Sequence, residues 1–204
     1  MSILFWILLI LGILFVYSQI STMTGGFNKR YKKLYKRKQS DRCSYWPNGS
    51  VFGIAWTIIY ALIVVSFLSF TWNLTPSHFS DFSTQFNLFD VTLLLFIINI
   101  ILNKIWSLVF MEGTKKAINN VIGKVTSSKK PPMYPFVFGI LIILLLILTG
   151  VTICILLGIQ HQWVAFGFFV PYNLWLCYAL FLNYDVYIFV KANKKINTSA
   201  FVTL

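Results

Sequence analysis

The chain has 204 residues, of which 58% are hydrophobic and 18% aromatic, and its mean hydropathy is +0.76. A soluble domain of this length has too little interior to bury so much apolar side chain, so the composition excludes a soluble globular domain and predicts an all-α membrane protein. The formal net charge is +12. In a membrane protein such an excess sets topology and attracts anionic lipid headgroups, so we predict no nucleic-acid partner.

Five apolar segments are each long enough to cross about 30 Å of hydrocarbon as a helix, at about 1.5 Å per residue. They are residues 3–20, 50–72, 88–111, 134–159 and 163–190. We therefore expect residues 1–192 to form a single domain, a five-transmembrane-helix bundle, and residues 193–204 to be a disordered cytoplasmic tail. The first segment lacks a basic start and a small-residue cleavage site, so we predict a permanent helix there and not a signal peptide.

The basic residues gather in three segments outside the predicted helices. Of the 17 Lys and Arg residues, eight lie in the loop 27–45, five in the loop 112–133 and three at Lys191, Lys194 and Lys195. In a five-helix topology these segments share one face of the membrane. The positive-inside rule therefore predicts that this face is cytoplasmic, with the C-terminus on it and the N-terminus across the membrane.

The second predicted helix follows a Pro-Asn-Gly turn, and a helix start tolerates Pro47 because its missing N–H is not needed there. Phe52, Trp56 and Tyr60 then recur every four residues, so their three rings share one face of the helix. A helix that faces only hydrocarbon does not need such a stripe. The spacing therefore indicates a binding surface.

The third predicted helix contains asparagine side chains, whose presence in a membrane-spanning helix needs an explanation. Asn99, Asn103, Trp106 and Phe110 are spaced at i, i+4, i+7 and i+11, so they share one face. An unpaired amide is costly in hydrocarbon, so we expect this face to point into the bundle. Two interpretations stay open, because interhelical asparagines can either contact a ligand or only join helices.

The fourth predicted helix is plainly aliphatic, whereas the fifth has a stripe of aromatic, small and amide residues. The stripe consists of Pro171, Trp175, Tyr178, Ala179, Leu182 and Asn183. In the predicted topology Trp56 lies about 9 Å deep, and the unusual residues of three helices converge in the cytoplasmic half of the membrane. An apolar, aromatic-lined cavity with a few polar groups is typical of a small-molecule site.

Three spaced motifs resemble those of the translocator protein or tryptophan-rich sensory protein family (TspO/MBR). The motif that enters the second helix is matched by Pro47, Val51, Phe52, Gly53, Trp56, Thr57 and Tyr60. The third-helix motif is matched by Leu102, Asn103 and Trp106, and the fifth-helix motif by Pro171, Tyr172, Trp175, Tyr178, Ala179, Leu182, Asn183 and Tyr184. The chain departs from the family pattern at Tyr45, Asn48 and Ile54, near the expected mouth of the pocket, so its ligand preference is open.

The resemblance implies a five-helix bundle that binds porphyrins, sterols or synthetic lipophilic ligands, often as a homodimer. It also implies the mitochondrial outer membrane if the source is a eukaryote, and otherwise the ER or a bacterial membrane. Leu182, Tyr187 and Lys191 satisfy the loose form of a sterol-associated motif.

We predict a membrane receptor or carrier that binds a flat lipophilic ligand, a porphyrin or a sterol, for tetrapyrrole or sterol transport, sensing or scavenging. The candidate ligand-binding residues are Trp46, Pro47, Phe52, Trp56, Tyr60, Asn103, Trp106, Phe110, Trp175, Ala179, Leu182 and Asn183. The alternatives are an enzyme that degrades porphyrin and a scaffold without a ligand. We find no acid–base residue in the predicted core and no metal-ligand spacing, so we expect no catalytic residue, metal or resident cofactor.

Overall fold

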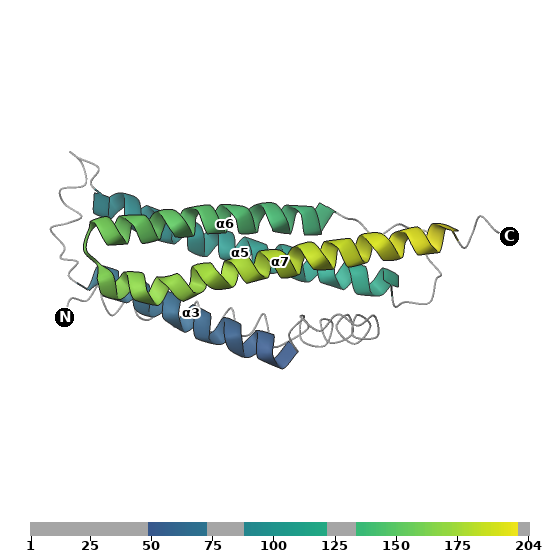
Figure 1. The fold of residues 1–204 in the computed structure, drawn as a ribbon, viewed down its shortest axis with the longest axis horizontal. Helices are drawn as coiled ribbons and strands as arrows, with labels where there is room; N and C mark the ends of the chain where they lie inside the picture. Colours follow the sequence, from purple (N-terminus) through teal and green to yellow (C-terminus); the bar gives the residue numbers. More distant parts are fainter. Residues whose placement is uncertain (1–48, 73–87, 122–133, 200–204) are drawn as a thin grey trace.

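The computed structural model describes residues 49–72, 88–121 and 134–199. Within these ranges the secondary structure is helical. The helices are α3 (Gly49–Thr71), α5 (Leu88–Val121), α6 (Tyr134–Ile159) and α7 (Trp163–Ser199), and they run along one common direction (Figure 1). The first predicted helix, residues 3–20, and the basic loop 27–45 lie outside the described residues, so the count of five helices stays a prediction.

Each described helix contains a stretch that is long and apolar enough to cross a membrane. Mean hydropathy is highest in α6, at 3.2, and lowest in α7, at 1.6. Large apolar side chains such as Leu148 and Leu174 are exposed on the outside of the bundle, where hydrocarbon would surround them. The prediction of an all-α membrane protein is confirmed for the residues that the structure describes.

Two helices extend beyond their predicted ends. The structure continues α5 to Val121 and α7 to Ser199, whereas the sequence predicted loop over 112–133 and a disordered tail over 193–204. Both predictions are therefore wrong for the residues that continue these helices. The apolar run marks where hydrocarbon ends, but a helix grows for as long as each added residue gains a hydrogen bond, and Lys and Ala favour helix.

The helices pack as an antiparallel series in which α5 contacts α6, α6 contacts α7 and α7 contacts α3. We call the end where α3 and α6 begin and α7 finishes the basic end, because Lys191 and the other tail lysines are near the C-terminal end of α7. We call the opposite end, where α6 turns into α7, the turn end. Asn99 of α5 donates to the carbonyl of Leu146 of α6 at 3.2 Å, which sets the register of that pair.

The turn from α6 into α7 is short. His161 has a φ of 55°, the left-handed conformation common just after a helix end. The N–H of Gln162 donates to the carbonyl of Leu157 at 2.8 Å, and the side-chain Nε2 of Gln160 donates to Oγ1 of Thr92 in α5 at 2.8 Å. These bonds tie the turn end of three helices together.

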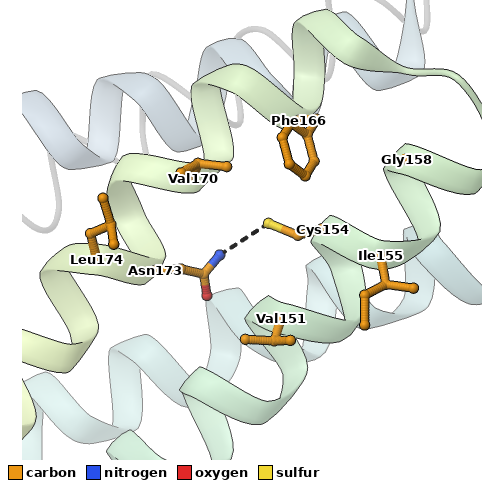
Figure 2. Close-up of a pocket in the computed structure, with 8 residues that line it drawn as sticks. All are labelled: Val151, Cys154, Ile155, Gly158, Phe166, Val170, Asn173 and Leu174. Atoms are coloured by element: carbon orange, nitrogen blue, oxygen red, sulfur yellow. Dashed lines mark hydrogen bonds between the residues drawn. The ribbon is translucent and has the colours of Figure 1, made fainter.

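Helices α6 and α7 approach closely where a glycine of α6 faces an asparagine of α7. A Cβ at Gly150 would collide with Oδ1 of Asn173, and a Cβ at Gly139 would lie 2.9 Å from Nδ2 of Asn183. Asn173 also donates to Sγ of Cys154 at 3.3 Å (Figure 2). Small residues let helix backbones approach in a membrane, and here they also make room for an amide.

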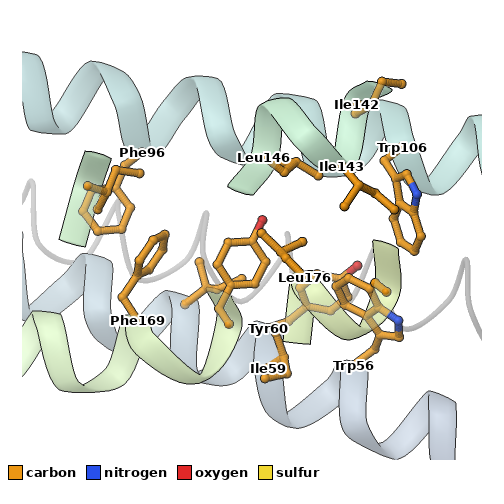
Figure 3. Close-up of a cluster of buried hydrophobic side chains, with 14 of the residues drawn as sticks. Trp56, Ile59, Tyr60, Phe96, Trp106, Ile142, Ile143, Leu146, Phe169 and Leu176 are labelled. Atoms are coloured by element: carbon orange, nitrogen blue, oxygen red, sulfur yellow. The ribbon is translucent and has the colours of Figure 1, made fainter. Parts of the chain in front are cut away.

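The buried core runs along the bundle as two aromatic groups. Towards the turn end, the ring centroids of Phe70 and Phe89 are 4.4 Å apart and those of Phe96 and Phe169 are 5.0 Å apart. Aliphatic side chains including Leu146 lie between this group and the tryptophans of the other group (Figure 3). The tryptophan group, towards the basic end, contains most of the residues singled out by sequence.

Candidate functional site

Five aromatic residues from three helices meet in the half of the bundle nearer the basic end. On α3, Trp56 and Tyr60 are one turn apart, with ring centroids 5.1 Å apart. The Trp56 ring lies 5.2 Å from Trp106 of α5 and 6.0 Å from Trp175 of α7, to which it is perpendicular. Phe110 stacks on Trp106 at 5.3 Å. We call Trp56, Tyr60, Trp106, Phe110 and Trp175 the aromatic cluster.

The aromatic cluster fills the space between α3 and α5. Among the described helices α3 packs mainly against α7, and it reaches α5 through long aromatic side chains such as Trp56 and Trp106. Both of these indoles are 1% exposed. The Trp56 ring meets Tyr60 and Trp106 in tilted arrangements and Trp175 edge-on, geometries that aromatic pairs prefer to direct face-to-face stacking. The cluster thus offers flat apolar surface from three helices, held by ring contacts and not by close backbone packing.

A chain of hydrogen bonds lies beside the cluster and joins the four helices that the structure describes. The hydroxyl of Tyr60 donates to Oδ1 of Asn103 at 3.1 Å, and Nδ2 of Asn103 donates to the hydroxyl of Tyr172 at 3.1 Å. The Tyr172 hydroxyl donates to Oδ1 of Asn99 at 2.8 Å, and Nδ2 of Asn99 donates to Oγ1 of Thr149 at 2.7 Å. We call these five residues the polar network.

The polar network contains both asparagines of the predicted amide face of α5. Asn99 and Asn103 point into the bundle, as expected, and are both 2% exposed. Their amides hydrogen-bond to neighbouring helices. Of the two interpretations, the geometry therefore favours the one in which the asparagines join helices and do not contact a ligand.

Three members of the network were not among the predicted site residues. Asn99 lies on the predicted face of Asn103, and Tyr172 follows Pro171 in the fifth-helix motif, so both had a signal in the sequence. Thr149 had none, because a hydroxyl in an aliphatic helix usually bonds its own backbone, as Thr149 also does to Leu145 at 2.9 Å.

A second set of buried polar groups lies nearer the basic end, and it differs from the polar network in its lack of hydrogen-bond partners. Trp106 Nε1, Ser107 Oγ and both amide atoms of Asn183 have no hydrogen-bond partner among the described residues. Asn183 is fully buried, and Ser107 is 1% exposed. Leaving a buried polar atom unpaired costs about 1–3 kcal/mol, so such atoms call for an explanation. Ser107 was not predicted from the sequence.

The other predicted site residues divide into those that the structure describes and those that it does not. Ala179 and Leu182 are buried on the inward face of α7. Trp46, Pro47 and the side chain of Phe52 lie outside the described part of the chain, so their contribution stays a prediction. Altogether α3, α5 and α7 place their predicted residues on faces that meet.

The residues of the sterol-associated motif lie in the second half of α7. Tyr187 is half-buried and Lys191 is exposed, with the Lys191 Nζ 5.6 Å from the centre of the Tyr187 ring. An exposed cation–π contact of this kind contributes about 0.5–1 kcal/mol. Leu182, in contrast, is 2% exposed and belongs to the core. The three residues therefore do not form one surface.

A groove of about 300 Å³ lies elsewhere, between α6 and α7 towards the turn end. Its walls run from Val151 to Gly158 and from Phe166 to Leu174 (Figure 2). The groove is almost wholly apolar and faces outward. At the aromatic cluster, where the sequence predicted a cavity, the rings are in contact with one another instead.

Together the long apolar helices define an integral membrane protein whose core contains aromatic rings and amides. A model of the TspO/MBR family matches residues 5–188, and the chain belongs to that family. No significant match was found among curated proteins or solved structures. Family membership supports a role in binding or transporting a lipophilic molecule in the membrane.

Proposed function

We propose that this protein is a membrane receptor or carrier for a flat lipophilic ligand of the porphyrin or sterol class. The ligand binds at the aromatic cluster, in the half of the bundle nearer the basic end. The observation that carries the proposal is the meeting of Trp56, Trp106 and Trp175 from three helices beside buried polar atoms that have no partner among the described residues. Indole faces stack on a flat ligand, and the polar atoms orient its edge.

Entry of a ligand requires the rings to move, and the packing supports this step. Because α3 reaches α5 through side chains, rotation of Trp56 or Trp106 opens space without separating closely packed backbones. The energy of a ring–ring contact is then replaced by that of a ring–ligand contact. Ligand binding therefore costs mainly the rearrangement of two or three side chains.

The orientation in the membrane is part of the same proposal. The basic end faces the cytoplasm, and the loop 27–45 with its eight Lys and Arg residues shortly precedes α3 in the sequence. Such a loop can meet the propionates of a porphyrin or the headgroups of anionic lipids.

Quenching of tryptophan fluorescence by protoporphyrin tests the proposal in the full chain in lipid nanodiscs. The wild-type protein should show saturable quenching, because the ligand stacks on the indoles of the cluster. A Trp56→Phe, Trp175→Phe double variant should bind about five- to 150-fold more weakly, since each of the two stacking contacts contributes about 0.5–1.5 kcal/mol beyond buried area.

Trp163 provides the control, because it is 61% exposed at the turn end and lies in neither aromatic group. Trp163→Phe should leave the affinity unchanged. Equal affinity in the double variant would contradict the proposed location. Absence of saturable binding of protoporphyrin and of cholesterol would contradict the proposed function and favour a scaffold, whereas products formed from bound porphyrin under light would favour an enzyme.

A further inference from the structure

Ser107 differs from most of the other hydroxyl residues that the structure describes, because its hydroxyl has no hydrogen-bond partner among them. Thr57, Thr92 and Thr152 each donate to the backbone carbonyl four residues earlier, at 2.8 to 3.0 Å. Ser66, which is equally buried, donates to the carbonyl of Ala165 at 2.7 Å. The Oγ of Ser107 makes no hydrogen bond to any described residue. It therefore also lacks the bond to a carbonyl of its own helix that commonly satisfies a serine hydroxyl in a membrane helix.

The register of the helices brings Ser107 to the same level as Asn183. Asn99 of α5 bonds to Leu146 of the antiparallel α6. Two turns further along α5 is Ser107, and the same distance back along α6 leads to the neighbourhood of Gly139. Gly139 is the residue against which the Asn183 amide packs. Trp106, whose Nε1 also has no described partner, precedes Ser107 directly.

We propose that Ser107 determines ligand specificity, and that with Trp106 and Asn183 it receives an uncharged hydroxyl or carbonyl oxygen of the ligand. This inference rests on the proposed function, and it adds a residue and a chemical preference to it. Tyr60 and Asn103, by contrast, bond to each other and serve the bundle.

The chemistry of the three side chains selects that kind of group. The Trp106 indole only donates, whereas the Ser107 hydroxyl and the Asn183 amide both donate and accept. One ligand oxygen can accept from an N–H and, if it is a hydroxyl, donate to the Asn183 carbonyl. None of the three side chains carries a charge, and a buried carboxylate without a cation is strongly disfavoured. The preferred ligand edge is therefore polar but neutral.

Three matched sterols test the inference with the full chain in lipid nanodiscs: cholesterol, its 3-ketone cholest-4-en-3-one and the 3-deoxy hydrocarbon cholest-5-ene. The wild-type protein should bind the two oxygenated sterols more tightly than the hydrocarbon. Ser107→Ala should reduce this preference about three- to tenfold, the value of one hydrogen bond, with little effect on the hydrocarbon. Ser107→Cys, which keeps the size but is a weak donor, should give the same loss and serves if the alanine variant folds poorly.

Ser66→Ala is the matched control, because it removes an equally buried serine hydroxyl that is already bonded. It should lower the thermal stability but leave the preference unchanged. A full preference in both Ser107 variants, or no preference in a wild-type protein that binds protoporphyrin or any of the sterols, would overturn this inference and leave the proposed function standing. A wild-type protein that binds none of these probes would overturn both.

Discussion

Buried polar residues of the same type have different roles in this bundle, and the difference lies in their partners. Asn99 and Asn103 each hydrogen-bond to neighbouring helices, whereas both amide atoms of Asn183 have no partner among the described residues. The first pair stabilises the fold, and we assign the third to the ligand. The sequence alone could not distinguish these two roles, because an inward-facing asparagine has the same spacing along the helix whether it hydrogen-bonds to another helix or to a ligand.

Tyr172 is the residue on which the polar network depends most, because its hydroxyl both accepts from Asn103 and donates to Asn99. Tyr172→Phe should lower the free energy of unfolding by about 1–2 kcal/mol, since interhelical hydrogen bonds in membranes contribute about 0.6–1.7 kcal/mol each. Tyr60→Phe, which removes one donor, should cost about half as much. Thermal unfolding in detergent measures both.

Tyr184→Phe is the control for these variants, because Tyr184 is 54% exposed. It should have almost no effect on unfolding. If Tyr172→Phe cost no more than Tyr184→Phe, the polar network would not stabilise the bundle.

At the scale of the helices, the seam between α6 and α7 depends on glycines that accept asparagine side chains. Gly150 and Gly139 are both buried, and an added Cβ would meet Asn173 or Asn183. From the sequence, α6 was predicted to be a plainly aliphatic helix, which gave no reason to single out these positions. Glycine is required at these positions because of asparagines about 20 to 45 positions later in the chain, so no local sequence pattern in α6 predicts it.

A pair of glycine variants tests this seam. Gly150→Ala should lower the midpoint of thermal unfolding, because the methyl group collides with the Asn173 amide and overpacking costs about 1–3 kcal/mol. Gly167→Ala should leave the midpoint unchanged or raise it, since Gly167 is exposed, a Cβ there meets nothing within 4 Å, and alanine favours helix by about 0.5–1 kcal/mol. Equal midpoints for the two variants would contradict the seam.

At the scale of the whole molecule, the sequence predicted the class, the family and the apolar core of each described helix. The length of each apolar segment and the positions of Trp56, Trp106 and Trp175 can be read directly from the sequence. It did not predict that α5 and α7 continue to Val121 and Ser199, because helix growth outside hydrocarbon has no apolar signature. It also did not predict Ser107, whose role depends on which hydroxyls find a partner after folding.

Photocrosslinking tests the central claim most directly, because it distinguishes the aromatic cluster from the outward groove. A photoreactive sterol or porphyrin analogue is bound to the full chain, and the labelled peptides are identified by mass spectrometry. We expect label that excess ligand competes away on Trp56–Tyr60, Asn103–Phe110 and Trp175–Asn183, the segments that meet near the basic end. Competable label confined to the groove segments Val151–Gly158 and Phe166–Leu174 would contradict the account.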